Sequence, residues 1–594
     1  MMKKGISAGY WPLISTVRRP GRYSGGEWGS APSDDGDLGK KRVSICLAFP
    51  DVYEVGMSYL GYQILYSLIR TLDYAEVERA YCPWIDMEAA MREANLPLRS
   101  LETGRPLSDF DAIGVTLQYE LCSTNILTIL DLGRVPLRSS DRGDRDPIVI
   151  GGGCGALAPA PLEIFFDAFC LGDGEDTVPE LLTALFSTKG CKREERLRAL
   201  SAIRGMYVPG FSATPARRRI VEDLDGGFLH RTMIVPNMNI IHDRAAVLVS
   251  KGCTRGCRFC QAGIIDRPVR ERGLESVSKQ IEDLLRFTGW EEIGLLSLST
   301  CDWTPLVDLL GFLSQSLGQD GVKLSLPSLR MDSFSVELAA KLETMRRGGL
   351  TFAPEAGSAR LRAVINKHVT DSDIDSTLDA VFEHGWNRVK LYFMMGLPTE
   401  TYQDLDGIAD IAFRAVAAAK RHKRRGDISA SLAGFVPKAH TPFQWEAQAT
   451  RDELRERGRY VKNLVRNSKI SLSYHEPDQT FLEGIFARGD RRLGEATLEA
   501  WSRGARFDGW SECFNADLWF EVFRDLELDP DWYASRQREI DEPLPWDIID
   551  TGVTKEFLAA ERALAFGGEQ TGDCRRTGCN LCGWQRYAKT CRNA

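Results

Sequence analysis

The sequence has no long hydrophobic run. No apolar stretch approaches the roughly 20 residues that a helix needs to cross a bilayer, which argues against a membrane-spanning helix. The first 20 residues also lack the continuous apolar core and the small-residue cleavage site of a secretory signal. We therefore expect a cytoplasmic protein without a membrane span.

Histidine, strong net charge and the common hydrolytic motifs are scarce or missing. Only 7 histidines occur among 594 residues, the first at His230, and there is no Walker loop, HExxH motif or Ser-His-Asp arrangement. The net charge of −8 does not suit a protein whose whole surface binds a nucleic acid. The dense basic run at 420–425 suits a solvated helix end. Hydrolysis and phosphoryl transfer are not indicated, and nucleic-acid contact, if any, would be local.

Alternating strand-like and helix-like segments fill most of the chain. Hydrophobic residues make up 43% and charged residues 27%, as in ordinary folded proteins, and the length exceeds what one hydrophobic core supports. Strands that alternate with helices predict parallel sheets with right-handed crossovers, so the expected fold class is α/β. We expect an irregular lead-in (1–41), a first α/β domain (42–186), a linker (187–243), a second α/β domain (244–444) and a mainly helical C-terminal domain (445–594).

Short apolar runs give the expected strands of both domains. In the first domain we expect strands at 43–49, 111–115, 147–150 and 168–171, and helices at 58–71 and 122–132. In the second domain we expect strands at 246–250, 293–298, 323–327, 350–353, 389–393 and 431–435. Six strands with intervening helices suit an open or partial (β/α) barrel, whose site lies at the carboxyl ends of the strands.

Two groups of glycines follow strands of the first domain. Gly151, Gly152 and Gly153 follow the third expected strand, and Gly172 and Gly174 follow the fourth. Open parallel sheets bind ligands beyond the carboxyl ends of their strands, and glycine lets a ligand approach the backbone. Tight turns alone also explain such glycines. Together, the two groups favour a nucleotide-like ligand.

Cys253, Cys257 and Cys260 form a CxxxCxxC motif in the second domain. Three cysteines can bind three irons of a [4Fe-4S] cluster and leave the fourth iron open. S-adenosylmethionine (SAM) can chelate that iron through its amino and carboxylate groups, and an electron from the cluster then splits the sulfonium. Phe259 provides an aromatic face suited to adenine. A zinc site or buried thiols are the alternative, although zinc normally takes a fourth protein ligand.

A second cysteine group occurs near residue 580. Its members have the spacings Cx4C, Cx2C and Cx8C, and their thiolates can enclose an auxiliary [4Fe-4S] cluster or a structural zinc ion. Iron–sulfur is favoured because the chain already needs electron delivery, and zinc stays open as the alternative. The group consists of Cys574, Cys579, Cys582 and Cys591.

Longer strings around these motifs carry a family resemblance. The chain resembles a largely uncharacterised branch of radical SAM proteins with an N-terminal cobalamin-binding-like domain, in the strings FPDVYEVGMSYLG, SKGCTRGCRFCQAG, LSLPSLRMDSF, TFAPEAGSARLRAVINK and KLYFMMGLPTET. The resemblance extends from about residue 23 to the C-terminus. It implies a Rossmann-like, flavodoxin-type first domain, a radical SAM partial (β/α) barrel and a mainly helical domain with the second cysteine group.

The resemblance also suggests how SAM would lie. The stretch 297–300 takes the place of the family's GGE motif, which holds the methionine amino group, although its residues depart from GGE. Glu355 would accept hydrogen bonds from the ribose hydroxyls, and Arg330 or Lys390 would pair with the methionine carboxylate. Ordinary charges at the barrel mouth are the alternative for these three. The candidate SAM contacts are Phe259, Ser299, Thr300, Arg330, Glu355 and Lys390.

For the first domain, the resemblance implies cobalamin. The DxHxxG motif that supplies an axial histidine in many cobalamin proteins is absent, and no histidine precedes His230. A bound cobalamin would therefore have no histidine ligand from this domain, as among radical SAM relatives. A Rossmann-like domain without cobalamin is the alternative.

The leading hypothesis is an enzyme that cleaves SAM reductively to a 5′-deoxyadenosyl radical, which abstracts hydrogen from an unactivated carbon. With cobalamin bound, the resemblance implies methylation of that carbon. The alternatives are radical rearrangement or ring closure, methylthiotransferase-like sulfur insertion into RNA or protein, and a non-catalytic iron–sulfur or cobalamin sensor. An electron donor such as flavodoxin or ferredoxin is the expected partner. The sequence indicates neither the substrate nor the oligomeric state.

Overall fold

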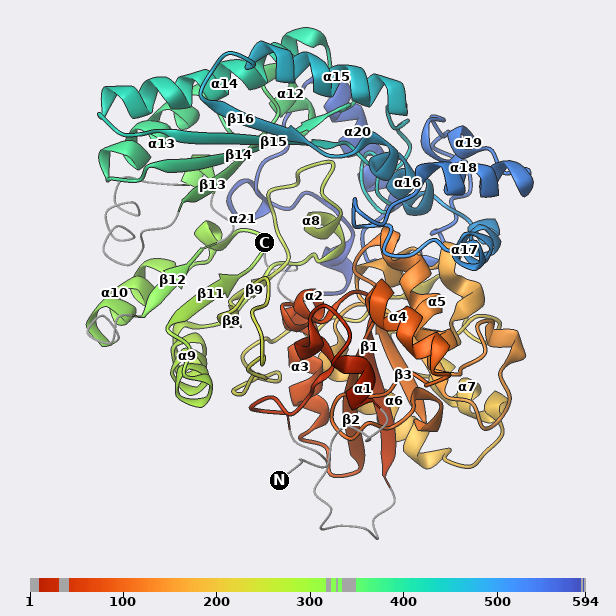
Figure 1. The fold of residues 1–594 in the computed structure, drawn as a ribbon. Helices are drawn as coiled ribbons and strands as arrows, with labels where there is room; N and C mark the ends of the chain where they lie inside the picture. Colours follow the sequence, from red (N-terminus) through yellow and green to blue (C-terminus); the bar gives the residue numbers. More distant parts are fainter. Residues whose placement is uncertain are drawn as a thin grey trace.

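Residues 43–207 are built on one six-stranded sheet (Figure 1). A computed structural model describes residues 10–30, 42–316, 322–326, 330–333, 349–588 and 591 of the chain. The strand order is β2-β1-β3-β4-β5-β6, and only β6 runs antiparallel to its neighbour. The first five strands have the flavodoxin-type order, which confirms the expected fold. Their bounds are β1 (Val43–Phe49), β2 (Ala75–Tyr81), β3 (Ala112–Thr116), β4 (Ile148–Gly152), β5 (Ala168–Cys170) and β6 (Met206–Tyr207).

Strand β2 is not predicted by the hydrophobic pattern, because its sequence AEVERAY carries three charged residues. Arg79 of this strand is fully buried and pairs with Glu27 at 2.9 Å and with Glu102 at 2.6 Å. Partners from distant segments offset the cost of burying the guanidinium charge. Glu27 belongs to the lead-in, so this segment packs on the first domain.

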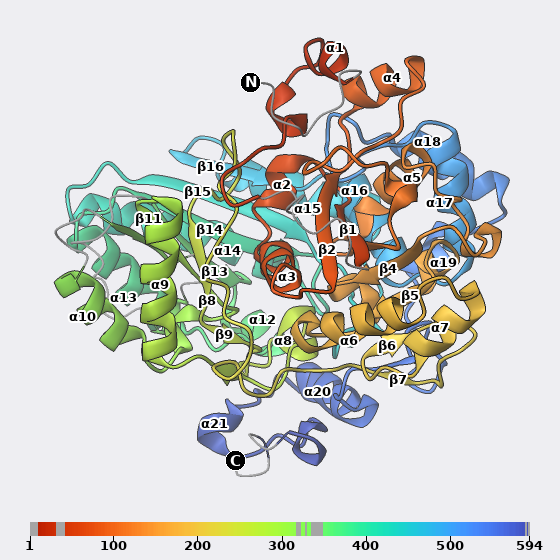
Figure 2. The ribbon, with the colours of Figure 1, turned by 90° about the horizontal axis from the view of Figure 1, so that it is seen from below.

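Helices cover both faces of this sheet, as Figure 2 shows from below. Residues that alternate along β1 explain the two layers: Ile45 and Leu47 pack with one pair of helices, and Cys46 and Ala48 with the other. The first pair is α3 (Leu60–Ile69) and α6 (Gly174–Ser187), and the second is α4 (Ile85–Glu93) and α5 (Ser123–Leu132). Short helices α1 (Trp11–Ile14) and α2 (Tyr53–Met57) precede them.

Residues 187–243, for which we expect a linker, contribute regular structure. Helix α7 (Arg193–Ser201) leads into β6 at the edge of the first sheet. Further along, β7 (Ala216–Arg217) pairs in parallel with β17 (Ile549–Asp550) of the C-terminal region. This stretch therefore joins the first domain to the C-terminal one.

The second domain holds two parallel sheets among its described residues, with the orders β12-β11-β8 and β13-β14-β15-β16. Both sheets share one hydrophobic core with the surrounding helices. All six expected strands are present, and they form the partial barrel together with an additional strand, β16. The strands are β8 (Ala245–Leu248), β11 (Glu292–Leu296), β12 (Lys323–Ser325), β13 (Leu350–Glu355), β14 (Arg388–Met395), β15 (Asp427–Gly434) and β16 (Ile470–Tyr474).

Strand β16 lies beyond residue 444, where we expect the barrel domain to end. Its residues alternate between buried or half-buried and exposed positions, which is typical of an edge strand. That weak hydrophobic signal explains why the sequence does not predict it. The helices around the barrel are α9 (Leu274–Thr288), α10 (Leu306–Ser316), α12 (Ala359–Val364), α13 (Asp371–Glu383), α14 (Tyr402–Arg421) and α15 (Arg451–Leu464).

The C-terminal helices contact both α/β domains. Trp501 donates a hydrogen bond to Thr128 of the first domain at 3.0 Å. Phe557 packs with Ile264, which belongs to the barrel domain. These contacts hold the two α/β domains in one assembly. The helices are α16 (Pro477–Ala487), α17 (Arg492–Ser502), α18 (Ala516–Asp525), α19 (Pro530–Ala534), α20 (Lys555–Gly567) and α21 (Cys574–Thr577).

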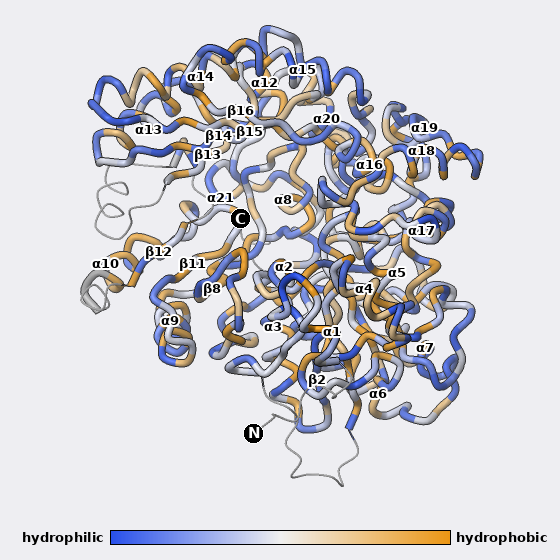
Figure 3. Tube along the Cα trace, in the orientation of Figure 1, coloured by the Kyte–Doolittle hydropathy of each residue, from blue (hydrophilic) through white to orange (hydrophobic). Residues whose placement is uncertain are grey.

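Hydrophobic and hydrophilic residues alternate along the outer helices, as Figure 3 shows for α13, α14 and α15. Such helices bury one face against a core and expose the other. Among the described residues, no helix has both the length and the apolar character needed to span a membrane.

Candidate active site and ligand pocket

The CxxxCxxC loop lies between β9 (Ser250–Lys251) and α8 (Gln261–Ile265), just after the first barrel strand. Cys260 is the N-cap of α8, and its thiol accepts a hydrogen bond from the Gly263 N–H at 3.3 Å. Cys253, Cys257 and Cys260 are all half-buried. The loop therefore presents three thiols at the end of the barrel where such folds carry their sites.

Glycines allow the loop to pack closely around its thiols. A Cβ atom on Gly263 would lie 3.3 Å from the Cys260 sulfur and 3.9 Å from the Cys253 Cβ, so a larger residue would crowd both cysteines. Gly256 has a φ of +69°, a left-handed conformation that favours glycine. Within the described residues, no three cysteine, histidine or acidic side chains already stand at metal-ligand spacing. The fit of a [4Fe-4S] cluster therefore rests on the three soft thiol ligands.

Two arginines of the loop anchor it to the rest of the protein. Arg255 donates to Asp302 at 2.8 Å and to Asp332 at 3.1 Å. Arg258 is fully buried and donates to Glu561 of α20 at 3.0 Å. Charge-assisted hydrogen bonds of this kind are strong and directional. They hold the loop between the barrel and the C-terminal helices.

Asn366 also holds the loop in place. Its amide nitrogen donates to the backbone carbonyls of Arg255 at 3.2 Å and Gly256 at 3.1 Å. Its amide oxygen accepts the Thr571 N–H at 2.9 Å. One buried side chain thus connects the cysteine loop to the segment that leads into the second cysteine group.

Arg330 lies beside the cysteine thiols. Its charge acts on Cys253 and Cys257, and its guanidinium donates to Asp332 at 3.0 Å. Burial, with a contribution from the neighbouring Cys257, raises the pKa of Cys260 to about 12. Metal ligation needs the thiolate form, which a nearby cation favours. Arg330 is thus placed to support anions at the loop.

Glu355 and Phe259 lie on the same side of the barrel as Cys260. Glu355 ends β13 with a φ of +69°, which is costly for a residue with a side chain. Its carboxylate accepts a hydrogen bond from Lys367 at 3.2 Å, and its charge acts on the Cys260 thiol. Phe259 packs against the apolar cluster that includes Ala356. Their positions are compatible with a ligand bound beside the loop.

The other candidate SAM contacts have different surroundings. Ser299 donates to Asp302 at 2.6 Å, and the buried Thr300 hydroxyl lies 2.9 Å from that of Ser297. Lys390 of β14 lies 4.6 Å from the ring centroid of Tyr392. Among the described residues, no hydrogen bond or ion pair joins Lys390 to the cysteine loop. The structure therefore brings Arg330 and Glu355 to the cysteines and leaves Lys390 apart.

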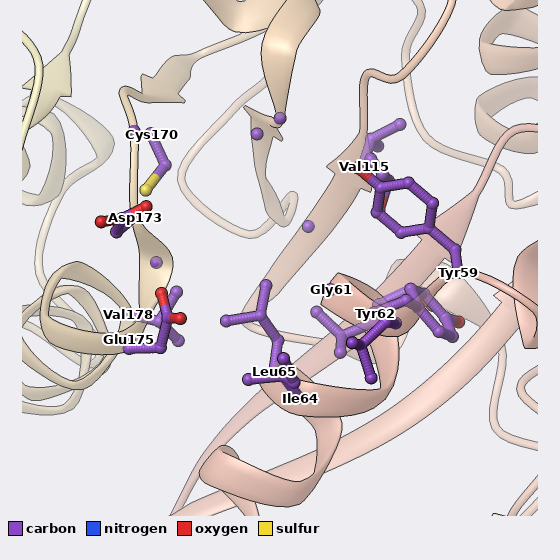
Figure 4. Close-up of a pocket in the computed structure, with 18 of the residues that line it drawn as sticks. Tyr59, Gly61, Tyr62, Ile64, Leu65, Val115, Cys170, Asp173, Glu175 and Val178 are labelled. Carbon is purple, nitrogen blue, oxygen red and sulfur yellow. The ribbon is translucent and has the colours of Figure 1, made fainter. Parts of the chain in front are cut away.

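A cavity of about 450 Å³ lies at the carboxyl ends of the first domain's strands. This volume is in the range of small-molecule sites, about 300–1,000 Å³. Figure 4 shows Tyr59 and Val115 on one side of the cavity and Cys170, Asp173 and Glu175 on the other. The lining includes Gly151, Gly152, Gly153, Gly172 and Gly174, which are all the glycines singled out in the sequence.

The cavity extends to the barrel domain. Leu248, Lys251 and Leu296 from β8, β9 and β11 complete its lining. Lys251 pairs with Asp173 at 3.0 Å and with Glu175 at 2.6 Å, and Lys251 lies two residues before Cys253 in the chain. The strand that leads into the cysteine loop therefore forms part of the pocket wall.

Asp173 is the centre of an ionic contact between the two domains. Arg270 of β10 (Arg270–Glu271) donates a hydrogen bond to its carboxylate, in addition to Lys251. Although burial raises the pKa of Asp173, Lys251 and Arg270 together hold it below its usual value. The carboxylate therefore stays ionised at the rim of the pocket.

The second cysteine group surrounds a separate cavity of about 300 Å³. Thr254 of the CxxxCxxC loop lines the same cavity. Spacing alone does not predict this neighbourhood, because the two groups are more than 300 residues apart in the sequence. The members that line the cavity are Cys574, Cys579, Cys582 and Cys591.

Sequence reasoning missed the polar residues that fix the site, namely Lys251, Asp302, Asp332 and Asn366. Three of them had a visible signal, because Lys251, Asp332 and Asn366 lie within the matched strings. Asp302 lies outside those strings, two residues after the stretch 297–300. Arg255, the partner of Asp302 and Asp332, lies 47 and 77 residues away in the chain, respectively. Periodicity carries no information on pairs at such separations.

Two family models match the chain. The model described as radical SAM proteins, N-terminal, matches residues 61–209, and that of the radical SAM superfamily matches residues 247–412. The first match covers most of the flavodoxin-type domain, and the second covers the cysteine loop and most of the barrel strands.

Relatives with similar sequences include an uncharacterised protein of Methanocaldococcus jannaschii, which is 26% identical over 459 residues, covering 76% of this chain and 90% of that protein. The ribosomal protein uS12 methylthiotransferase RimO of Thermotoga sp. strain RQ2 is 24% identical over 290 residues, covering 45% of this chain and 67% of that enzyme. Among solved structures, the radical SAM methyltransferase TsrM of Kitasatospora setae with cobalamin and a [4Fe-4S] cluster bound is similar at 16% identity. That match covers 70% of this chain and 75% of that one, with a TM-score of 0.48.

Proposed function

Because the chain belongs to the radical SAM superfamily, we propose that it methylates an unactivated carbon with the help of cobalamin in the pocket of the first domain. The [4Fe-4S] cluster would be held by Cys253, Cys257 and Cys260. When bound, the cluster supplies the electron that splits SAM into methionine and a 5′-deoxyadenosyl radical, and cobalamin supplies a methyl carrier.

The observation that carries this proposal is that the strand leading into the cysteine loop forms part of the pocket wall. Glycines of the first domain and Lys251 of the barrel domain line one cavity, and Lys251 is two residues from Cys253. A ligand in that cavity is therefore next to the segment that holds the cluster. Two reactive groups held side by side gain the rate advantage of proximity.

The residues around the loop have distinct tasks in this proposal. The three thiolates would hold the cluster, and Arg330 offers a cation to the methionine carboxylate. Glu355 is paired with Lys367 at 3.2 Å and offers its carboxylate to the ribose hydroxyls. Phe259 contributes an apolar surface for adenine. These tasks are binding and orientation, and they exclude water from a reactive radical.

The pocket of the first domain suits a large ligand held by shape. Its glycines leave backbone accessible, and its apolar side chains come from the sheet and from α3 and α6. Its described lining contains no histidine, so we propose that cobalamin is held there without a histidine ligand. An electron donor such as flavodoxin or ferredoxin would reduce the cluster.

The test is anaerobic purification and reconstitution of wild type, Cys257→Ala and the control Cys191→Ala, which changes a thiol away from both cysteine groups. We expect equimolar cobalt in all three proteins and 5′-deoxyadenosine from SAM in wild type and control only. Methyl-labelled SAM should transfer its label to the bound cobalamin. SAM cleavage without cobalt uptake overturns the role of the pocket, and no cleavage in wild type overturns the enzyme assignment.

Sulfur insertion is the second candidate, because the uS12 methylthiotransferase RimO is similar over 45% of the chain. A methylthiotransferase-like mechanism would place cluster cysteines in the N-terminal domain. Here Cys46, Cys82, Cys122 and Cys170 are buried and Cys154 is exposed. Their spacing does not form an obvious set of cluster ligands. Cobalt content separates the candidates, since sulfur insertion predicts none.

A further inference from the structure

The four cysteines of the second group converge although they are spread over eighteen residues. All of them line one cavity of about 300 Å³. Cys579 is exposed and the other three are half-buried. Four soft ligands around one cavity suit a metal centre with a complete set of cysteine ligands.

A zinc ion and a [4Fe-4S] cluster, the two metal centres that four cysteines commonly hold, differ in the space that they need between the cysteine sulfurs. A zinc ion draws four thiolate sulfurs to about 2.3 Å and leaves no space between them. A [4Fe-4S] cluster places four irons and four sulfides between the cysteine sulfurs and therefore needs a cavity. The observed space of about 300 Å³ fits the cluster.

The lining also provides groups that suit sulfide. Trp584 is 2% exposed and lines the cavity, and within the described residues its indole N–H has no hydrogen-bond partner. Such an orphan donor is costly unless an acceptor binds. Arg267 also lines the cavity and offers positive charge to an anionic cluster, whereas Arg575 is already paired with Glu271 at 3.2 Å and with Asp573 at 3.3 Å.

The cavity is adjacent to the CxxxCxxC loop. Thr254 of that loop lines it. Arg267 lies between the CxxxCxxC loop and the cavity. Its side chain lines the cavity, and its Nη2 atom would be 3.6 Å from a Cβ atom added to Gly256 of the loop. The Thr571 N–H, donated to Asn366 at 2.9 Å, ties the two segments together.

We propose that Cys574, Cys579, Cys582 and Cys591 hold a second [4Fe-4S] cluster that passes electrons to the cluster of the CxxxCxxC loop. Four thiolates occupy all four irons, which leaves no open iron for SAM. The exposed Cys579 and the 68% exposed Leu581 put the site within reach of a protein electron donor.

The electron transfer changes no bond. A reduced flavodoxin or ferredoxin gives one electron to the oxidised second cluster, which then gives one electron to the oxidised loop cluster. The second cluster returns to its oxidised state, and the donor ends oxidised by one electron. The existence of the second cluster is independent of the proposed function, whereas the relay rests on it.

The cluster is tested in a variant that lacks the first site, Cys253→Ala/Cys257→Ala/Cys260→Ala. After anaerobic reconstitution we expect about four irons and four sulfides per chain, with the absorbance and electron paramagnetic resonance of a [4Fe-4S] centre. A protein without iron, or with one zinc ion instead, overturns the proposal. Because no SAM reaction is measured, failure of the proposed function cannot produce either result.

The relay is tested in Cys579→Ser/Cys582→Ser, with Cys191→Ser as the matched control and circular dichroism to verify folding. With dithionite as reductant, we expect SAM cleavage to stay within about twofold of the control. With reduced flavodoxin, we expect it to fall at least about tenfold. Equal rates with both reductants overturn the relay. If the double variant fails to fold, Cys579→Ser alone, at the exposed position, serves for the same comparison.

Discussion

The two α/β domains both place a site at the carboxyl ends of parallel strands, but different kinds of residue form the two sites. The first domain lines its pocket with glycine backbone and apolar side chains. The barrel instead presents thiols, with Arg330 and Glu355 beside them. The topology is thus common to both, and the residues just after each strand set the ligand chemistry.

The two sites are therefore expected to fail in different ways. A pocket that binds by shape fails when it is filled, whereas a site that binds by coordination fails when a ligand is lost or displaced. A larger residue in the pocket should therefore weaken ligand binding in the first domain. A displaced or missing thiol should weaken cluster binding in the barrel. Contacts between the domains are tested separately, at Lys251 and at His440, whose ring lies 2.8 Å from the Leu157 carbonyl.

The largest effect is expected for Gly263→Val in the barrel site. The added Cβ would lie 3.3 Å from the Cys260 sulfur, so the thiol must move and the loop loses its cluster geometry. We expect SAM cleavage to fall about 100-fold, measured as 5′-deoxyadenosine per chain. Gly311→Val, at an exposed helix position with nothing within 4 Å, is the control. Wild-type cleavage by Gly263→Val would show that the cluster tolerates a displaced Cys260 thiol.

Gly152→Leu tests the pocket of the first domain by filling it, without displacing a neighbouring residue. A Cβ at this position meets only the Cys170 Cβ at 3.9 Å, so the sheet accepts it and the side chain enters the pocket. We expect cobalamin to bind at least about tenfold more weakly, with cluster iron unchanged. Titration with hydroxocobalamin, followed by absorbance, measures the change against Gly311→Leu. Unaltered affinity would place cobalamin elsewhere or nowhere.

Lys251→Met tests the ionic contact between the domains. The substitution leaves Glu175 without its 2.6 Å partner, and the side chains involved are 11–19% exposed. We expect the free energy of unfolding in urea to fall by about 2 kcal/mol. Arg198→Met breaks the pair with Glu194, whose side chains are 69% and 68% exposed, and should change it by less than about 0.5 kcal/mol. Equal effects of the two would mean that the inter-domain contact adds no stability.

His440 gives the smallest expected effect, through pH. Its ring donates to the Leu157 carbonyl of the first domain at 2.8 Å, and burial lowers its pKa from 6.5 to about 4. Between these values the unfolded chain binds the proton that the folded chain excludes, so stability falls as pH falls. We expect a loss of about 1 kcal/mol from pH 6.5 to 5.5 that is absent in His440→Gln.

The measurement for His440 is urea unfolding at both pH values for wild type, His440→Gln and the exposed control His475→Gln. The control should keep the wild-type dependence. A wild-type dependence in His440→Gln as well would assign the pH effect to other groups, such as the buried His230, whose pKa is also lowered to about 4.

Much of the fold was predictable because hydrophobic strands have a local signature. Strand β1 begins and ends at the expected residues, and the other expected strands lie within a few residues of their predicted positions. Strands β2 and β16 were not predictable for opposite reasons. Arg79 in β2 is buried by distant partners, and β16 is an edge strand with exposed positions. In both, tertiary contacts replace the local hydrophobic pattern.

The sequence by itself indicates which kinds of ligand this protein can bind. Cys253, Cys257 and Cys260 lie close together in the sequence, and the glycines directly follow β4 and β5. Which of these parts meet depends on the packing of the whole chain. That packing places Lys251 on the wall of the glycine pocket, and it brings Cys574 next to Thr254. Ligand type follows from residue identity, whereas proximity follows from how two α/β domains and a C-terminal segment pack together.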